Sequence, residues 1–444
     1  MKLTITPGRP LRGALRLPGD KSLSHRAALL AALAEGESRI ANFLDAGVTQ
    51  ALLGALRQLG VAWELDADHT LRIAGRGLNG FVPSAQALDC GNSATTLRLL
   101  AGALAASGVS AALDGSPGLR RRPMRRIVEP LQQMGAPIQA SPAGTAPLYL
   151  AQRPASQKLL GLRHTLPIAS AQVKSCLLLA GLGAERPTEI AEPCATRDHT
   201  ERMLRKMGVS VAPLNPSATG AGCLTRLIPP QNSLSPLRIG LPGDISSAAF
   251  FIVAALITPG SEITIENVLL NPGRTGLIEA LLSMGARIAI QPEPQPDWEP
   301  VGNIHVAYSS LAGGEVAGEL VVRMIDEFPA FAVAAAFARG ETQVRDAGEL
   351  RAKESDRIQS LAELVRLGAR ITAQEAGFAV EGLSRLEGGE AQAGGDHRIG
   401  MALAIAGLAA RRPVSVAGAE IIAESFPGFV SALQSLGAQV AVSR

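Results

Sequence analysis

The feature that most constrains the fold of this chain is a pattern that recurs six times. Each copy runs from a polar turn into an apolar helix, then a short β-like segment, then a second helix that ends in a Leu-Gly or Met-Gly step. The closing glycines are Gly60, Gly135, Gly208, Gly285, Gly368 and Gly437. Their spacing of about 70–80 residues exceeds the usual solenoid period, so each copy is expected to be a compact unit. Six copies indicate two domains of three units.

The first copy shows how a polar helix start is built. Asp20 and Ser22 are good N-cap residues, and the Ala/Leu-rich stretch after them stops at Gly36. Lys21, Ser22 and Arg26 therefore lie on the first turns of a helix, where free N–H groups and the helix dipole favour an anion. One such helix alone is typical of ordinary capping, whereas its repetition along the chain favours a phosphate or carboxylate site.

Hydrophobic periodicity within the first copy predicts the order β-α-β-α-β-β. Strand-like patterns cover residues 11–17, 38–44, 61–65 and 70–74, and residues 48–59 have helical spacing. Together with the helix after Asp20, this alternation predicts an α/β fold.

A duplicated turn marks the domain boundaries. Leu-Pro-Gly-Asp occurs at residues 17–20 and again at residues 241–244. We place the two domain crossings at these turns. One domain then spans residues 19–241, and the other combines residues 1–18 with residues 242–444.

Composition excludes several classes of function. The chain has 444 residues, 47% of them hydrophobic, which is enough for two domains with real cores. A net charge of +3 and 3% aromatic residues argue against nucleic-acid binding. The longest apolar run, 248–257, is too short to span a bilayer. Four cysteines without CxxC spacing, and an N-terminus without an apolar signal core, fit a reduced cytoplasmic setting.

Two stretches in the second half are dense in charged side chains. Adjacent carboxylates at 326–327 precede an Ala-rich helix, and residues 349–357 mix acids with bases. If the second stretch is helical, Lys353 and Arg357 share one face, which is also the pattern of an exposed, salt-bridged helix. The basic run at 119–126 has two interpretations as well, a solvated helix start or an anion site.

These motifs together resemble those of the 5-enolpyruvylshikimate-3-phosphate synthase family, the 3-phosphoshikimate 1-carboxyvinyltransferases. In chain order the motifs are PGDKSLSHR, LDCGNSATTLR, RRRPM, ASAQVKS, MIDEFP, RAKESDR, GDHRIGM and SFPGF. The resemblance implies a two-domain inverse α/β barrel-like fold, with three β-α-β-α-β-β units in each domain and the active site in the interdomain cleft. It also implies transfer of the enolpyruvyl group of phosphoenolpyruvate to the 5-hydroxyl of shikimate 3-phosphate, with release of phosphate and without a metal or organic cofactor.

The resemblance also implies roles for individual residues. The residues implied to bind shikimate 3-phosphate are Lys21, Ser22, Arg26, Ser170, Gln172, Arg197, Asp326 and Lys353. Those implied to bind phosphoenolpyruvate are Lys21, Asn92, Ala94, Thr95, Arg122, Gln172, Arg357 and Arg398. In catalysis, Asp326 would receive the proton of the 5-hydroxyl, Glu354 would handle the proton at the enol methylene, and Lys21 would contact both substrates.

Three positions depart from the pattern of many family members. Ala94 replaces a glycine, Glu424 stands where one branch has a lysine, and Glu349 stands where some members have asparagine. Glu424 is therefore left out of the predicted site. Glyphosate is longer than phosphoenolpyruvate, so the methyl group of Ala94 is expected to hinder it. The chain thus resembles a glyphosate-insensitive branch of the family.

Two rival interpretations remain open. UDP-N-acetylglucosamine enolpyruvyl transferases share the fold and donor, but they typically have a reactive cysteine in the loop matching 116–119 and Lys-Asn where this chain has Lys21-Ser22. A phosphate- or RNA-end-binding module on a similar fold explains the basic run but leaves Asp326 and Glu354 without a role.

We expect a cytoplasmic monomer that acts on two small-molecule substrates and binds neither nucleic acid nor a membrane.

Overall fold

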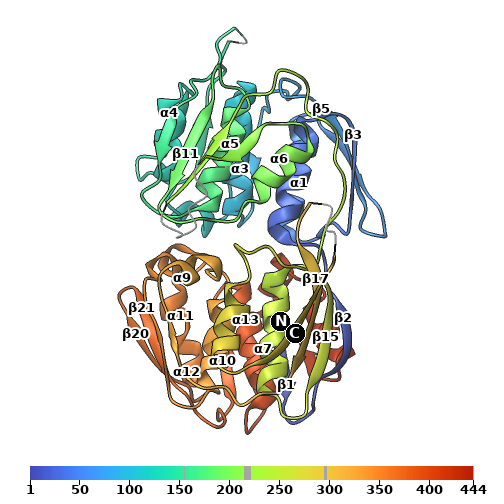
Figure 1. Cartoon of the computed structure of the whole chain (residues 1–444), viewed down its shortest axis with the longest axis vertical. Coiled ribbons are helices and arrows are strands. Elements are labelled where there is room, and N and C mark those ends of the chain that lie inside the picture. Colours follow the sequence, from blue (N-terminus) through green and yellow to red (C-terminus); the bar gives the residue numbers. More distant parts are fainter. Residues whose placement is uncertain (155, 215–221, 295–297, 444) are drawn as a thin grey trace. The chain divides into compact units, whose positions relative to one another are not determined.

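The computed structural model describes residues 1–154, 156–214, 222–294 and 298–443, which form two compact halves. The continuous half is Gly19–Leu241, and the discontinuous half combines Met1–Pro18 with Pro242–Arg444. Figure 1 labels their helices and strands.

The described residues of the continuous half form three four-stranded sheets. The strands of the first sheet, in order across it, are β14 (Arg238–Gly240), β3 (Glu35–Ala41), β5 (Leu71–Arg76) and β4 (Ala62–Leu65). Those of the second are β6 (Leu88–Asp89), β7 (Ala111–Asp114), β9 (Leu148–Leu150) and β8 (Ile138–Ala140). Those of the third are β10 (Arg163–Thr165), β11 (Thr188–Glu192), β13 (Cys223–Leu227) and β12 (Val211–Pro213). The helices are α1 (Lys21–Leu33), α2 (Gly47–Gln58), α3 (Ala94–Ser107), η1 (Leu119–Arg121), α4 (Arg125–Gln133), α5 (Ala171–Gly181) and α6 (His199–Lys206).

In the discontinuous half, the residues that the structure describes form three sheets of the same size. The strands of the first of these sheets, in order across it, are β16 (Arg287–Pro292), β17 (Val301–Ala307), β15 (Glu262–Leu269) and β2 (Arg12–Arg16). Those of the second are β18 (Glu315–Val316), β19 (Glu341–Val344), β21 (Gly377–Glu381) and β20 (Arg370–Gln374). Those of the third are β22 (Gly389–Gln392), β23 (Val414–Ala417), β1 (Lys2–Thr6) and β24 (Gln439–Ser443). The helices are α7 (Ile245–Ile257), α8 (Gly276–Ser283), α9 (Glu319–Arg323), α10 (Phe328–Ala336), η2 (Gly348–Ala352), α11 (Arg357–Ser360), α12 (Ala362–Arg366), α13 (His397–Ala406), η3 (Gly407–Ala409), η4 (Ala419–Glu424) and α14 (Phe429–Ser435). Across the described ranges, no helix combines the length and the apolar character needed to cross a membrane.

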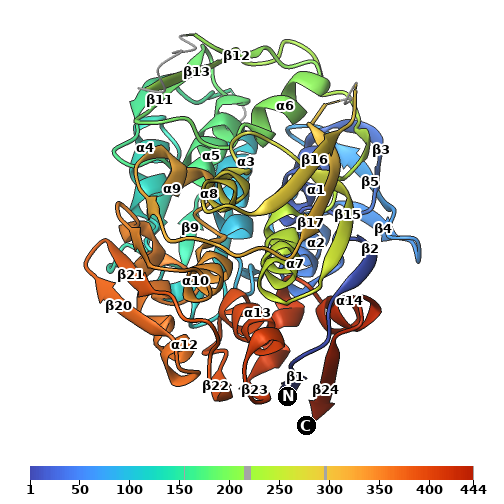
Figure 2. The same cartoon turned by 60° about the horizontal axis from the view of Figure 1, so that its bottom comes forward.

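All six sheets share one pairing pattern. One edge strand runs parallel to its neighbour, and the remaining two pairings are antiparallel, as in the row β22, β23, β1 and β24 (Figure 2). The same pattern holds for β14, β3, β5 and β4. The α/β class predicted from the repeat is therefore confirmed, and the helix expected at 48–59 is found as α2.

Two edge strands belong to a sheet of one half, although the next helix along the chain belongs to the other half. β2 precedes α1 of the continuous half, yet it pairs in parallel with β15 of the discontinuous half. β14 precedes α7 of the discontinuous half, yet it pairs in parallel with β3 of the continuous half. The Leu-Pro-Gly-Asp turns at 17–20 and 241–244 carry the chain from one half to the other.

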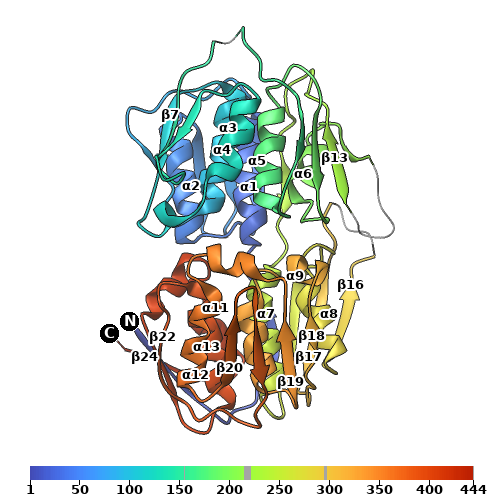
Figure 3. The same cartoon turned by 90° about the vertical axis from the view of Figure 1, so that its left-hand side faces the viewer.

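The first long helix of each unit is buried on nearly all sides. Every residue of α7 is buried, as is every residue of α1 from Leu23 onward. In the discontinuous half α7, α10 and α13 contact one another. In the continuous half α3 contacts both α1 and α5 (Figure 3). Because their sides are apolar, polar groups gather at the ends of these helices.

Side chains cap the starts of most of these helices. Asp20 accepts a hydrogen bond from the N–H of Leu23 at 2.9 Å. The other side chains that cap in this way are Ser93 of α3, Ser170 of α5, Asp244 of α7 and Asp396 of α13. Each cap satisfies one of four backbone N–H groups without an intrahelical partner. The remaining groups leave a positive end that favours an anion.

The close contact of α3 with α5 yields a stability prediction. A Cβ at Gly102 of α3 would lie 2.2 Å from the Cys176 carbonyl oxygen of α5. We expect Gly102→Ala to lower the free energy of unfolding by about 1–3 kcal/mol, because the helices must separate. Gly54 of α2 is the control, since it is exposed and a Cβ there meets nothing within 4 Å. Gly54→Ala should stabilise by up to about 1 kcal/mol. Urea unfolding measures both, and equal changes would contradict the close-packing argument.

Candidate functional site

The start of α1 brings three predicted site residues together. Lys21 and Ser22 are half-buried, and Arg26 is buried one turn later. The Arg26 guanidinium donates through Nε to Thr200 Oγ1 at 2.9 Å and through Nη2 to Ser175 Oγ at 2.8 Å. Its Nη1 donates to the Ser22 carbonyl at 3.1 Å. Arg26 therefore ties α1 to α5 and α6, a structural role that its sequence position did not reveal.

The starts of α3 and α5 meet through Gln172. Its Nε2 donates to Thr95 Oγ1 at 2.9 Å, and its Oε1 accepts from Arg98. Arg98 also donates to the Pro123 carbonyl at 3.1 Å. The structure thus joins two predicted site residues, Thr95 and Gln172. Arg98 was not among the predicted site residues, although it lies one turn after Ala94 in the LDCGNSATTLR motif.

The remaining predicted residues of the continuous half stand at the same helix starts or in nearby loops. Asn92 Oδ1 accepts from Ser116 Oγ at 2.9 Å, and its amide N–H groups have no partner within the described ranges. Ala94 and Arg122 are buried, whereas Arg197 is half-buried in the β11–α6 loop. Burial of Arg122 argues against the interpretation of this arginine as part of a solvated helix start.

Lys174 of the ASAQVKS motif is buried between two carboxylates. Its Nζ lies 2.9 Å from Glu192 Oε2 and 2.8 Å from Glu201 Oε1. Burial lowers the pKa of Lys174, but the ion pairs with Glu201 and Glu192 outweigh it, so the pKa is raised above its usual value. Lys174 also donates to the Thr196 carbonyl at 3.4 Å. It therefore holds the segment before Arg197 against α5.

In the discontinuous half, Arg357 connects three carboxylates. Its side chain is 1% exposed. Nε lies 2.9 Å from Asp396 Oδ2, and Nη2 lies 2.6 Å from Glu354 Oε2. Nη1 lies 3.6 Å from Asp326 Oδ1, too far for a hydrogen bond, and has no other partner in the described part of the chain. Arg357 thus brings together carboxylates from the MIDEFP, RAKESDR and GDHRIGM motifs.

Residues 349–357 do not form the exposed, salt-bridged helix that was one interpretation of their charge pattern. Lys353 is extended, and α11 begins only at Arg357, with Asp356 as its N-cap. Lys353 Nζ donates instead to Asp326 Oδ1 at 3.2 Å, and both side chains are 19% exposed. Three carboxylates therefore surround two cations. This pairing depends on contacts with other motifs, which helical periodicity cannot indicate.

Asp396 and Arg398 occupy the start of α13. Burial raises the pKa of Asp396, but the adjacent Arg357 outweighs this effect and holds the pKa below its usual value. Asp396 also accepts from Ser355 Oγ at 3.1 Å. Arg398 is 5% exposed, and its guanidinium makes no hydrogen bond or ion pair with any other residue that the structure describes. The Gly395-Asp396 step matches the Gly19-Asp20 step at the start of α1, and this repetition was the sequence signal for the cap.

Glu327, next to Asp326, belongs to a second buried network. It accepts a hydrogen bond from Ser246 Oγ at the start of α7. Arg274 Nη2 donates to the same hydroxyl at 2.9 Å and lies 3.5 Å from Asp244 Oδ1. This network fixes the turn that carries Asp326 against α7. The sequence alone did not distinguish the roles of the two adjacent carboxylates.

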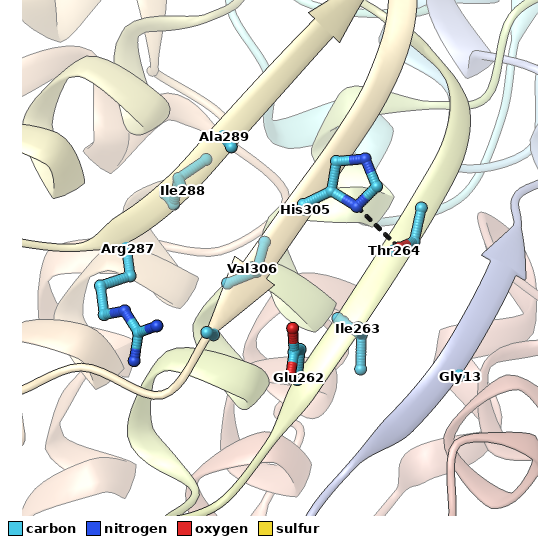
Figure 4. Close-up of a pocket in the computed structure, with 10 residues that line it drawn as sticks. Gly13, Glu262, Ile263, Thr264, Arg287, Ile288, Ala289, His305 and Val306 are labelled. Carbon is cyan, nitrogen blue, oxygen red and sulfur yellow. Dashed lines mark hydrogen bonds between the residues drawn. The ribbon is translucent and has the colours of Figure 1, made fainter.

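A groove on the β16–β17–β15 face holds none of the predicted site residues. It has a volume of about 320 Å³ and includes Glu262, Arg287 and His305. His305 Nδ1 and Thr264 Oγ1 lie 2.9 Å apart (Figure 4). These side chains project from strands, whereas the predicted residues stand at helix starts and in loops.

Comparison with known proteins gives a consistent result. A family model described as EPSP synthase (3-phosphoshikimate 1-carboxyvinyltransferase) matches residues 5–433. A protein named 3-phosphoshikimate 1-carboxyvinyltransferase from Desulforudis audaxviator is 48% identical over 98% of this chain and 99% of its own length. A protein of the same name from Geobacter metallireducens is 45% identical over 98% of this chain and 99% of its own.

Solved structures show the same similarity. An EPSP synthase structure from Acinetobacter baumannii matches with a TM-score of 0.85 and 40% identity, over all of both chains. The enolpyruvyl transferase NikO from Streptomyces tendae matches with a TM-score of 0.77, over 99% of this chain and 98% of its own. Because the two sequences are only 21% identical, this similarity shows a shared fold alone. The predicted inverse α/β barrel-like fold class is confirmed.

The buried Lys174 cluster predicts a large stability effect. Lys174→Met would leave Glu192 and Glu201 buried without their cation. We expect the free energy of unfolding to fall by about 3–5 kcal/mol. Lys158→Met is the matched control at an exposed lysine and should change stability by less than about 0.5 kcal/mol. Denaturant unfolding measures both variants, and a loss below about 1 kcal/mol for Lys174→Met would argue against a tightly paired cluster.

Proposed function

The chain belongs to the EPSP synthase (3-phosphoshikimate 1-carboxyvinyltransferase) family, and we propose that the residues at its polar helix starts bind the substrates and carry out the reaction. The enzyme transfers the enolpyruvyl group of phosphoenolpyruvate to the 5-hydroxyl of shikimate 3-phosphate and releases phosphate. This is a step of the shikimate pathway to aromatic amino acids. Relatives of this name match over nearly the whole chain, so neither rival interpretation is favoured.

The substrates bring two phosphates and two carboxylates together, so their site needs cations and helix starts. For shikimate 3-phosphate we propose Lys21, Ser22, Arg26, Ser170, Gln172, Arg197, Asp326 and Lys353. For phosphoenolpyruvate we propose Lys21, Asn92, Ala94, Thr95, Arg122, Gln172, Arg357 and Arg398. Donors without hydrogen bonds in the described ranges support this assignment: the Asn92 amide, Arg357 Nη1 and the Arg398 guanidinium.

The proposed residues are divided between the two halves of the chain. Lys21 and Gln172 belong to the continuous half, whereas Asp326 and Arg398 belong to the discontinuous half. A single active site therefore requires both halves. We propose that residues 19–241 form one domain, that residues 1–18 and 242–444 form the other, and that the site lies in the cleft between them. A crystal structure with shikimate 3-phosphate bound tests this placement.

Two carboxylates supply the acid–base chemistry in this proposal. Asp326 receives the proton of the 5-hydroxyl as that oxygen bonds to the enol carbon of phosphoenolpyruvate. Glu354 delivers a proton to the methylene carbon and later removes one as phosphate leaves. The observation that carries the proposal is the cluster in which Arg357 contacts both carboxylates and Lys353 contacts Asp326. The cations favour ionised Asp326, while Glu354 must be protonated for part of the cycle.

Removing either acid–base group should slow turnover without preventing substrate binding. We expect Asp326→Asn and Glu354→Gln each to lower kcat by roughly 10²–10⁴-fold, because each loses a proton transfer. Shikimate 3-phosphate binding, measured by calorimetry, should change little. Glu319→Gln alters an exposed carboxylate at the start of α9 and should retain full turnover. Wild-type turnover in either site variant would overturn its assigned role.

We also propose that the enzyme belongs to a glyphosate-insensitive branch. Ala94 stands where many family members have glycine, and its side chain is buried at the first position of α3. Its methyl group would take up space beside the donor. Glyphosate is longer than phosphoenolpyruvate and would meet this group first. The competing explanation is that Ala94 only begins the helix and that the backbone shifts to make room.

The inhibition constant for glyphosate distinguishes these explanations. We expect Ala94→Gly to bind glyphosate roughly 10- to 200-fold more tightly, because an extra methyl in a packed site costs about 1–3 kcal/mol. The KM for phosphoenolpyruvate should change much less. Ala101→Gly places the same substitution at a buried position further along α3 and should leave the inhibition constant unchanged. If Ala94→Gly is no more sensitive than the parent enzyme, the steric argument is wrong.

We further propose that the enzyme acts as a monomer in the cytoplasm. Cys90, Cys176, Cys194 and Cys223 form no disulfide, which fits a reducing compartment. Light scattering coupled to size-exclusion chromatography tests the monomer by its mass.

A further inference from the structure

A buried histidine joins two of the helix starts that carry proposed substrate ligands. His25 lies one turn after Lys21 in α1 and is completely buried. Its Nδ1 is 2.7 Å from the Lys21 carbonyl oxygen. Its Nε2 is 3.2 Å from Oγ of Ser93, the N-cap of α3. The proposed function gives His25 no role.

The partners of His25 determine where its protons lie. A carbonyl oxygen can only accept, so Nδ1 carries the hydrogen and donates to Lys21. In a neutral ring Nε2 then has no hydrogen and must accept, so the Ser93 hydroxyl donates to it. The same Ser93 oxygen accepts from the Thr96 N–H at 3.1 Å and from Thr96 Oγ1 at 2.9 Å. Every donor in this chain of bonds has an acceptor.

Protonation of the ring would change this arrangement. Nε2 would become a donor, and the Ser93 hydroxyl, which donates to a neutral ring, would have to turn and accept instead. Burial, together with the nearby charges of Lys21 and Arg26, outweighs the backbone hydrogen bonds to Lys21 and Val48, which raise the pKa of His25, so that its pKa falls to about 4. His25 is therefore neutral at physiological pH.

We propose that His25 is a positioning residue which, as the neutral Nδ1–H tautomer, holds the first turn of α1 against the N-cap of α3. Lys21 lies on one side of this bridge, and Asn92 and Ala94 flank Ser93 on the other. The bridge thereby sets the spacing between a ligand of both substrates and the ligands of phosphoenolpyruvate. This consequence for activity rests on the proposed function, whereas the bridge itself does not.

Nuclear magnetic resonance tests the tautomer directly. The chain has six histidines, so selective ¹⁵N labelling of their rings gives few signals. His25→Phe identifies the His25 signals by their loss; if that variant does not fold, Ser93→Ala identifies them by their shift. We expect the Nδ1–H pattern and no titration between pH 8 and pH 5.5. An Nε2–H pattern, or titration near pH 6.5, would overturn the proposal.

Steady-state kinetics tests the positioning role. Loss of the bridge is expected to raise the KM for phosphoenolpyruvate by roughly tenfold in both His25→Phe and Ser93→Ala. Because both substitutions break the same link, the double variant should resemble the single ones rather than multiply their effects. His164→Phe is the matched control, since His164 is also buried but lies on β10. It should leave the KM unchanged.

The outcomes separate the bridge from the proposed function. A His25→Phe enzyme that loses thermal stability but keeps the parent KM and kcat would show a purely structural histidine and overturn the proposal. Independent, multiplicative effects of His25→Phe and Ser93→Ala would overturn it as well. If the parent enzyme released no phosphate from phosphoenolpyruvate with shikimate 3-phosphate while the Nδ1–H signal persisted, the function would be wrong and the bridge would stand.

Discussion

Free backbone N–H groups at the starts of buried helices are the constraint on which the rest of this structure depends. Helices such as α7 are apolar on all sides, so their ends must carry the polar groups. Asp20, Ser93, Asp244 and Asp396 each satisfy one N–H, and the rest leave a positive helix end. The substrates of this enzyme are rich in phosphate and carboxylate. The positions that the fold must keep polar are therefore the positions best suited to bind them.

Buried cations organise the side chains around these helix starts. Arg357 holds carboxylates from three motifs, and Lys174 holds Glu192 and Glu201. Taking an ion out of water costs several kcal/mol, so such clusters add less net stability than their short distances suggest. Removing one partner is much more costly, because the others stay buried without compensation. Both clusters consequently resist rearrangement. We attribute to this rigidity the fixed geometry of the proposed acid–base pair.

Neighbouring residues on α1 connect the three units of the continuous half. His25 reaches Ser93 at the start of α3, while Arg26 reaches Ser175 in α5 and Thr200 in α6. The discontinuous half uses different residues for the same purpose. There Glu327 reaches α7 through Ser246, and Arg357 reaches α13 through Asp396. Each half thus links the starts of its buried helices by polar contacts, and two of the linking residues, Arg26 and Arg357, are themselves proposed substrate ligands.

The sequence by itself determined the sixfold repeat, the α/β class, the capped start at Asp20, and α2 to within about two residues. These features depend on residues within a few positions of one another, so local pattern suffices to indicate them. Only the tertiary structure decided the partners of the charged side chains. His25 and Ser93 are 68 positions apart, and Arg357 and Asp396 are 39 apart. The interpretation of residues 349–357 as an exposed helix was wrong for that reason, because burial of Arg357 among distant carboxylates outweighed local helical spacing. Periodicity indicates which residues start a helix, but long-range packing selects the partners of their side chains.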